Sequence, residues 1–269
     1  MIPKKIHYCW FGRNPKPKLA EKCIKSWKKY CPDYEIVEWN EDNFDLNSAP
    51  LYVRQAYEAK KWAFVTDYVR LKVVYDHGGI YLDTDVEVVR TLDELLVHSA
   101  FFGFEGGPYI ATGLGFGAEK CTPIVGELMA DYQELPFVMD NGQHDLTSCP
   151  VRNTAVFIRH GLRPDNTSQL LDGDICILST EWLCPFNDWE GQINRTKNTV
   201  SIHWYSASWE TEAYKKRKLE SVKKHRKLKY RNYLYNIRYF PNSVLYKLFG
   251  EQRYTELKRW IKRRNINDS

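Results

Sequence analysis

The chain has 269 residues, of which 43% are hydrophobic, and its formal net charge is +5. This composition is normal for a soluble globular protein, and the length allows one large domain or one domain with an extension. Seven cysteines without C-x-x-C spacing argue against a disulfide framework and a zinc cluster, and for a reducing compartment. An N-terminus interrupted by lysines and the lack of a long apolar run predict neither a signal peptide nor a membrane span, so we expect a cytoplasmic protein.

Hydrophobic periodicity, followed from the first residue onward, predicts strands and helices in alternation. Strands are expected at residues 6–10, 34–39, 86–89, 100–105, 113–116, 175–178 and 199–203, with a short one leading into Asp83. Helices are expected at residues 19–30, 51–58, 61–76 and 124–134. Such alternation is typical of an α/β sheet covered by helices, in which sites lie beyond the carboxyl ends of the strands.

Charge is distributed unevenly along the chain. Residues 211–269 contain 18 Lys and Arg against 5 Asp and Glu, whereas residues 1–210 contain 21 against 29. The composition changes just after Trp209, which makes this point the best candidate for a domain boundary. We therefore predict an α/β domain over residues 1–210 and a basic, aromatic-rich helical extension over residues 211–269.

Residues 78–85 (GGIYLDTD) place two carboxylates, Asp83 and Asp85, one residue apart where a short strand ends. A slight bend at this point would direct both carboxylates toward one position. Oxygen ligands in this pattern suit a hard divalent cation, Mg²⁺ or Mn²⁺, that keeps open positions for phosphate oxygens. On this motif alone, an ordinary turn at a strand end, where Asp is common, is an equal alternative.

The helix expected at residues 61–76 carries Asp67 and Arg70 three residues apart, so that their side chains share one face. The glycine pair that follows could turn this face toward the two aspartates. A carboxylate and a guanidinium beside a metal site could hold sugar hydroxyls and an anionic leaving group. A surface ion pair is the simpler alternative.

Three blocks of sequence together resemble glycosyltransferase family 32. They are AFVTDYVR at 63–70 with GGIYLDTD at 78–85, IPKKIHYCWFG at 2–12, and IHWYSASW at 202–209. This family, marked by a DXD sugar-binding motif, includes fungal α-mannosyltransferases and bacterial capsule and O-antigen transferases, with the glucosylating cytotoxins more distant. Three blocks in the right order are far more specific than one motif. The resemblance implies a GT-A-type nucleotide-sugar-binding sheet flanked by helices, with residues 1–210 as the catalytic domain.

The resemblance also implies how a donor nucleotide would be held. Trp10, which ends the first strand, would stack on the nucleobase, and Tyr81 would lie near the nucleoside. Asp83 would contact the ribose and assist the metal, whereas Asp85 would be the better direct ligand. Trp10 could instead be a core tryptophan, and Tyr81 could simply pack against the sheet.

Further roles follow from the same resemblance. Asp67 and Arg70 would contact the donor sugar. His203 would complete the metal shell, with Ser208 and Trp209 near the diphosphate, although a lone histidine in an aromatic-rich run is usually a packed one. Nitrogen with carboxylate ligation favours Mn²⁺ over Mg²⁺.

The block at residues 149–154 occupies the position of a Gly-Pro segment that lines the donor pocket in the family. Cys149 stands where relatives have Gly, which weakens the match, and Asn153 and Thr154 are additional site candidates. Glu105, before a glycine pair, could face the acceptor or be a solvated turn carboxylate.

These features and the resemblance together predict an enzyme, a metal-dependent glycosyltransferase that uses a nucleotide sugar. The resemblance implies a retaining hexosyltransferase, with UDP-sugars favoured, in bacterial surface polysaccharide synthesis. Its acceptor would be a glycan or a lipid-linked saccharide. A nucleotide-sugar or phosphodiester hydrolase could use the same metal. A nucleic-acid-binding protein would explain the basic tail but not the acidic first 210 residues, so we expect no nucleic-acid partner.

The basic tail offers two interpretations. Residues 215–229 contain nine Lys and Arg, followed by an apolar set at helical spacing that is interrupted at Pro241. The set comprises Tyr230, Tyr233, Leu234, Ile237, Phe240, Val244, Leu245 and Leu248. The tail could be a helical cap on the catalytic domain, or it could hold the protein peripherally on the anionic inner face of the cell membrane.

Overall fold

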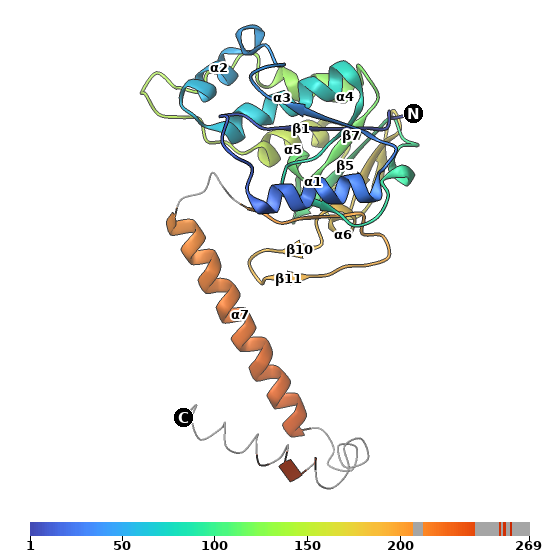
Figure 1. Ribbon diagram of the computed structural model, residues 1–269, viewed down its shortest axis with the longest axis vertical. Helices are drawn as coiled ribbons and strands as arrows, with labels where there is room; N and C mark the ends of the chain where they lie inside the picture. The colour runs from blue at the N-terminus through green and yellow to red at the C-terminus, as the bar shows by residue number, and fades with distance from the viewer. Residues whose placement is uncertain (207–211, 240–252, 254, 257–258, 260–269) are drawn as a thin grey trace. The chain divides into compact units, whose positions relative to one another are not determined.

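The computed structural model describes residues 1–206, 212–239, 253, 255, 256 and 259 (Figure 1). Ser208 and Trp209, expected near the diphosphate, therefore lie outside the described residues. The chain divides into two compact units, residues 1–188 with 192–210 and residues 189–191 with 211–269. The domain boundary that composition suggests after residue 210 stays a prediction.

A mixed sheet forms the centre of the first unit (Figure 1). Its strands are β1 (Lys5–Cys9), β2 (Glu35–Trp39), β3 (Gly79–Tyr81), β5 (Ala100–Gly106), β6 (Tyr109–Ile110), β7 (Phe116–Ala118), β8 (Gln169–Leu171) and β9 (Ile175–Leu178). Their order is β2-β1-β3-β7-β5-β9-β8, with β6 paired to β5. β1 is parallel to both β2 and β3, whereas β7 is antiparallel to β3 and β5.

Helices cover both faces of this sheet. They are α1 (Lys18–Tyr30), α2 (Leu51–Glu58), α3 (Trp62–His77), α4 (Pro123–Ala130), α5 (Cys149–Arg159) and α6 (Thr180–Leu183). Neighbouring strand residues point to opposite faces. Tyr81 accordingly joins a core cluster with α2 to α5, while Ile80 joins a second cluster with α1 and α6. The expected α/β sheet flanked by helices is confirmed.

Smaller elements complete the first unit. A two-stranded ladder joins β4 (Val86–Val88) to β12 (Ser201–His203), and β10 (Phe186–Asn187) pairs with β11 (Gln192–Ile193). Short 3₁₀ helices occur at Leu46–Ser48, Asp93–Leu95 and Thr112–Leu114.

Three sequence-based assignments need correction. The strand expected at residues 113–116 begins only at Phe116, because Gly113 lies in a 3₁₀ helix and Gly115 adopts a φ of 119° that no extended strand contains. The strand expected at residues 199–203 pairs with β4 and does not close the main sheet. Helix α5 was not expected, although Pro150 in its first turn is a typical helix start.

The turn from α3 into β3 requires both glycines. Gly78 has a φ of 64° and Gly79 a φ of 111°, a region that L side chains rarely adopt. A Cβ on Gly79 would also lie 3.0 Å from the Nε2 atom of His7 and 3.0 Å from the carbonyl oxygen of Lys5. This close approach lets α3 end directly against β1, so that α3 and the end of β3 lie next to each other.

The second unit contains α7 (Glu212–Tyr239), which carries the basic residues of the tail. Lys216, Lys223, Lys224 and Lys227 are exposed on this helix. None of the helices in the described part of the chain is long and apolar enough to cross a bilayer. Of the expected apolar stripe, Phe240 and the positions after it lie outside the described residues, as does the interruption at Pro241.

Buried His7 of β1 links three parts of the fold. Its Nε2 lies 2.8 Å from the carbonyl oxygen of Gly78, and its Nδ1 accepts a hydrogen bond of 3.1 Å from the indole of Trp39. These partners select the neutral ring with the proton on Nε2. Burial lowers the pKa of His7 to about 4, because a buried imidazolium is poorly solvated.

We expect this histidine to make stability depend on pH. Between about pH 4 and pH 6.5 the unfolded chain binds a proton that the folded chain does not, so the stability rises with pH through this window and is complete above it. One pKa unit corresponds to about 1.4 kcal/mol. On acidification through this window, the free energy of unfolding should therefore fall on the order of 2–3 kcal/mol further in the wild type than in a His7→Gln variant. Urea denaturation at both ends of the window measures the difference. His160→Gln, at an exposed position, is the control, and equal pH dependence of wild type and His7→Gln would contradict the expectation.

Candidate active site

Two neighbouring parallel strands deliver the first site residues to one edge of the sheet. β1 pairs with β3 through Ile6 with Ile80 and His7 with Tyr81, so the two strands end side by side. Trp10 follows β1, and Asp83 follows β3. This is the edge where α/β sheets hold their ligands.

The β4–β12 ladder brings His203 to the same edge of the sheet, next to Asp85, although the two residues are 118 positions apart in the sequence. Because His203 pairs with Val86, its imidazole lies beside the aspartate that precedes β4. Its Nε2 is 3.1 Å from Oδ1 of Asp85. The following backbone then wraps this aspartate: Ser206 donates its N–H to Oδ2 at 2.8 Å, and Trp204 donates to the carbonyl oxygen at 3.0 Å.

Asp83, Asp85 and His203 fit a divalent cation. One ligand atom from each lies within 4.8 Å of the others, and only 13% of the Asp85 side chain and 10% of the His203 side chain are exposed. The Nδ1 atom of His203 is also buried and has no hydrogen-bond partner among the described residues. Two carboxylates with one imidazole are a donor set suited to Mn²⁺ or Mg²⁺, and the nitrogen favours Mn²⁺.

Charge is concentrated in this cluster. Burial by itself would raise the pKa of Asp85, but the imidazole of His203 and the N–H of Ser206 hold it well below the usual range. Burial likewise opposes the charged form of His203, yet the Asp85 carboxylate raises the pKa of that imidazole well above its ordinary value. Burial raises the pKa of Asp83, and the nearby charge of Asp85 adds to the effect.

Arg70 of α3 lies buried between two carboxylates. Its Nη2 is 3.2 Å from Oδ1 of Asp67 and 3.3 Å from Oδ1 of Asp83, and only 4% of its side chain is exposed. Its Nε donates to the carbonyl oxygen of Thr66 at 3.0 Å. The alternative of a surface ion pair between Asp67 and Arg70 is therefore wrong, and the expected approach of α3 to the Asp-X-Asp segment is confirmed.

Tyr81 and Asp67 extend this buried network. The hydroxyl of Tyr81 donates to Oδ1 of Asp83 at 2.8 Å, and Arg70 lies 5.2 Å from the centre of the Tyr81 ring. Burial raises the pKa of Asp67 to about 6, although the guanidinium of Arg70 opposes the rise. Tyr81 is thus both a core residue and a hydrogen-bond partner of the site, so its two interpretations are compatible.

Trp10 is half-buried at the same sheet edge. Its indole N–H donates to the carbonyl oxygen of Asn14 at 2.6 Å, and the Nζ of Lys16 lies 5.7 Å from the ring centre. One part of the indole packs against the core cluster that contains α1. The side chain is neither fully buried nor free to rotate. Its position is therefore compatible with a nucleobase stacking on the indole.

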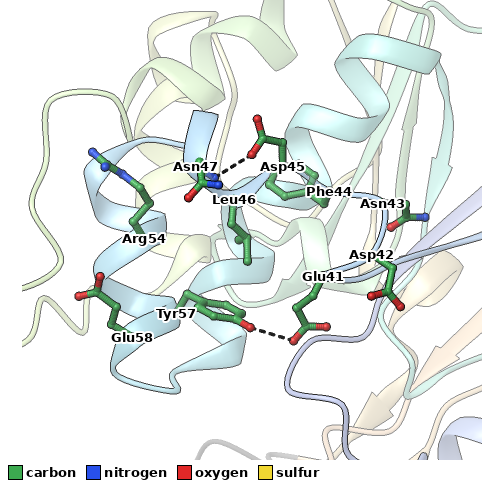
Figure 2. Close-up of a pocket in the computed structure, with 10 residues that line it drawn as sticks. All are labelled: Glu41, Asp42, Asn43, Phe44, Asp45, Leu46, Asn47, Arg54, Tyr57 and Glu58. Carbon is green, nitrogen blue, oxygen red and sulfur yellow. Dashed lines mark hydrogen bonds between the residues drawn. The ribbon is translucent and has the colours of Figure 1, made fainter.

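The segment after Trp10 is tied to a neighbouring pocket. Figure 2 shows this pocket of about 650 Å³, lined by Glu41, Asp42, Asn43, Phe44, Asp45, Leu46, Asn47, Arg54, Tyr57 and Glu58. Oε1 of Glu41 accepts hydrogen bonds from the N–H of Gly12 at 2.6 Å and from the hydroxyl of Tyr57 at 3.2 Å. The pocket includes none of the three metal-type ligands, so we place the candidate site outside it.

Glu105 is the penultimate residue of β5, and charged groups of the cluster act on it. Burial raises its pKa, and His203, Asp83 and Arg70 all act on its charge. Tyr205, whose ring centre is 4.2 Å from that of His203, donates its hydroxyl to the carbonyl oxygen of Glu105 at 2.9 Å. A partly buried carboxylate facing these groups does not fit a solvated turn.

The other candidates have structural partners. The hydroxyl of Thr154 accepts from the N–H of Ile110 at 2.8 Å and donates to the carbonyl oxygen of Pro150 at 2.6 Å, while Asn153 donates to Thr112 at 3.2 Å. These bonds attach α5 to the sheet, and neither residue contacts the carboxylates in the described interactions. Their site roles stay predictions.

Two residues at the site were missed by the sequence analysis. Gly113 lies against it so closely that a Cβ there would be 2.5 Å from Oδ2 of Asp83 and 3.1 Å from Nη1 of Arg70. Cys149, considered only as a departure from the family pattern, places its sulfur 3.8 Å from Nη1 of Arg70. No local pattern marks either contact, because each joins elements far apart in sequence.

Comparison with known proteins identifies the segment that contains the two aspartates. Residues 17–102 match the family model described as "Glycosyltransferase sugar-binding region containing DXD motif". This segment is therefore similar to a DXD glycosyltransferase sugar-binding region. The region contains Asp67, Arg70, Asp83 and Asp85, and the resemblance inferred from the sequence is confirmed.

Two curated proteins are similar to part of the chain. The chain is 38% identical over 104 residues to inositol phosphoceramide mannosyltransferase 3 of Schizosaccharomyces pombe, covering 37% of this chain and 29% of that protein. It is 31% identical over 107 residues to an uncharacterized glycosyltransferase of Acanthamoeba polyphaga mimivirus, covering 38% and 43%. The chain thus spans less than half the length of these relatives. Among solved structures, the PaToxG glycosyltransferase is similar to this chain with a TM-score of 0.46 and 20% sequence identity. The similarity covers 59% of this chain and 69% of that one.

The contact at Gly113 gives a test of the site geometry. In a Gly113→Ala variant the new methyl group must displace Asp83 or Arg70, so we expect the affinity for Mn²⁺ to fall about 10- to 100-fold while the fold is kept. Isothermal titration with Mn²⁺ measures the affinity, and thermal melting checks the fold. Gly126→Ala, whose Cβ would meet only the Tyr75 ring at 3.3 Å, is the matched control. Equal Mn²⁺ affinity in wild type and Gly113→Ala would show that this arrangement does not form the metal site.

Proposed function

We propose that the protein is a metal-dependent, retaining glycosyltransferase that moves a hexose from a nucleotide sugar, with UDP-sugars favoured, to a glycan or lipid-linked saccharide. One observation carries the proposal: the ligand atoms of Asp83, Asp85 and His203 lie within 4.8 Å of one another, beside buried Arg70, and the aspartates belong to a DXD sugar-binding region. Similarity to an inositol phosphoceramide mannosyltransferase is compatible with a lipid-linked acceptor. Surface polysaccharide synthesis is the proposed pathway.

Different residues of the chain bind different parts of the donor. Trp10 offers a flat face for the base, which would contribute about 1–3 kcal/mol to nucleotide binding. Arg70 and Asp67, held rigidly by burial and by each other, orient the sugar hydroxyls. Tyr81 fixes the carboxylate of Asp83 through its hydrogen bond. Rigid placement of this kind lowers the barrier by keeping the reacting groups in position.

Asp85, Asp83 and His203 would hold Mn²⁺ or Mg²⁺ at the diphosphate. The cation, when bound, supplies Lewis acidity that stabilises the negative charge of the departing nucleoside diphosphate. The backbone of residues 203–206 keeps Asp85 in place through the N–H groups of Trp204 and Ser206. This wrapped segment also excludes water from one side of the site, which limits hydrolysis.

Retention of configuration requires a second nucleophilic event or a same-face approach of the acceptor. Glu105 is a partly buried carboxylate, and burial raises its pKa above the ordinary value, which favours the protonated form. We propose that it faces the acceptor hydroxyl. An internal-return route, in which the leaving phosphate takes the hydroxyl proton, and a double displacement through a carboxylate both fit this arrangement.

The activity is tested with Asp85→Asn, which keeps an acceptor for the N–H of Ser206 but removes a charge. We expect hexose transfer from a UDP-sugar to fall about 100-fold or more, because the cation loses a charged ligand, and thermal melting checks that the variant is still folded. Asp33→Ala, an exposed carboxylate paired with Lys4, is the control. Transfer is followed by product analysis with and without a lipid-linked acceptor and with excess EDTA. Full activity in EDTA would contradict the metal role, and release of free sugar alone would identify a hydrolase.

We also propose that α7 holds the enzyme peripherally against an anionic membrane, where a lipid-linked acceptor would be found. Each exposed Lys or Arg near such a surface contributes about 1 kcal/mol, so a few engaged residues suffice. The helix presents exposed lysines at positions 216, 223, 224 and 227. The alternative is a helical cap with a solvated basic face.

Liposome co-sedimentation distinguishes the two roles. The intact protein should sediment with anionic vesicles at low salt and be released at high salt, and loss of residues 211–269 should abolish binding. Lys223→Glu with Lys224→Glu should weaken binding more than Lys120→Glu, a single exposed change in the first unit. If the intact protein ignores anionic and neutral vesicles alike, the membrane role is wrong.

A further inference from the structure

A second buried polar cluster lies on the α2 to α5 side of the sheet. It consists of Tyr52 on α2, Tyr132 just after α4 and Arg152 on α5. The two tyrosine rings meet edge to face at 5.2 Å, and the guanidinium carbon of Arg152 lies 5.7 Å from the centre of each ring. Three elements far apart in sequence therefore direct polar groups into one small region.

These groups are buried without adequate partners. Tyr52 and Tyr132 are 0% and 1% exposed. Among the described residues, five buried side-chain nitrogen or oxygen atoms make no hydrogen bond, and three of the five are the hydroxyls of Tyr52 and Tyr132 and the Nε of Arg152. Native proteins rarely leave buried donors unpaired, and an ordered water with two to four polar partners is their usual companion.

The cluster is rigidly framed. Arg152 pairs with Asp145, which lies on the loop between α4 and α5. Oε1 of Gln55, one turn after Tyr52, accepts from the N–H groups of Phe137 and Val138 at 2.8 Å and 3.0 Å, so the same loop is fixed to α2. The polar atoms therefore cannot turn outward to find solvent.

The cluster adjoins the candidate site through α5 and Asp67. Cys149 and Arg152 are three residues apart on α5 and share a face, and the Cys149 sulfur is 3.8 Å from Nη1 of Arg70, the partner of Asp67. The charge of Asp67 acts on the hydroxyls of both Tyr52 and Tyr132, and that of Arg152 acts on Asp67. Asp67 is thus the site carboxylate that interacts electrostatically with this cluster.

We propose that Tyr52, Tyr132 and Arg152 hold an ordered water molecule and that this hydrated cluster positions the carboxylate of Asp67. The water accepts from the Arg152 Nε–H and from one phenol, and it donates to the other phenol and to Asp67. The three residues are positioning residues, since they act through Asp67. The positioning of Asp67 for catalysis rests on the proposed transferase function, whereas the presence of the water molecule does not depend on it.

The direction of the change in melting temperature tests whether the cluster holds a water molecule. If the hydroxyls are hydrated, Tyr52→Phe and Tyr132→Phe each remove a hydrogen bond and should lower the melting temperature. If the cluster is dry, the same changes remove an unpaired buried group, and the melting temperature should stay equal or rise. Tyr34→Phe, which loses a hydroxyl bonded to Asp93 at 2.8 Å far from the cluster, is the matched control for the effect of a satisfied hydroxyl. An unchanged or raised melting temperature in both cluster variants overturns the water.

Positioning is tested by a double-mutant cycle with Asp67→Asn. In the wild-type background, Tyr132→Phe should lower kcat roughly tenfold and leave the Kd of UDP unchanged, because only the placement of Asp67 is disturbed. In the Asp67→Asn background the same change should have no further effect on the residual kcat. Independent, multiplying effects would overturn the positioning role. Absence of turnover in the wild type would overturn the transferase function and the positioning role with it, while the melting comparison would still decide the water.

Discussion

The guanidinium of Arg70 lies buried between the carboxylates of Asp67 and Asp83, and the site depends on this pairing. Two desolvated carboxylates would repel each other, and each alone would be costly to ionise. The α3–β3 turn sets their spacing, because Gly78 and Gly79 allow the helix to end directly against β1. Removing the guanidinium would leave buried charge unpaired, which typically costs about 3–5 kcal/mol.

The second requirement is the approach of a distant strand to the same edge. β12 adds His203 to two aspartates that are separated from it by more than a hundred residues, and the backbone after it closes around Asp85. The DXD region supplies the carboxylates and Arg70, but it ends before this strand. The proposed ligand set therefore needs more of the first unit than the matched segment, which by itself holds only the two aspartates.

The sequence correctly predicts the helices and strands whose signals are local. The helix at residues 51–58 and the strand at residues 175–178 agree with the structure because their apolar spacing and flanking turns are sufficient signals. The family resemblance, more than periodicity, placed His203 in the metal set. Gly113 and the Tyr52–Tyr132 pair could not be foreseen, since their importance comes from contacts between distant elements. The strand expected at residues 113–116 failed for a related reason: apolar character does not reveal a glycine with positive φ.

Asp83, Asp85 and His203 are proposed to bind a divalent cation beside a nucleotide held at Trp10. Diffraction from crystals grown with UDP and Mn²⁺, recorded at the manganese absorption edge, would locate both ligands. We expect an anomalous peak within bonding distance of oxygens of the aspartates and a nitrogen of His203, with the uracil against the Trp10 indole. A bound UDP with no peak among these three residues, or with its base elsewhere, would rule out this arrangement.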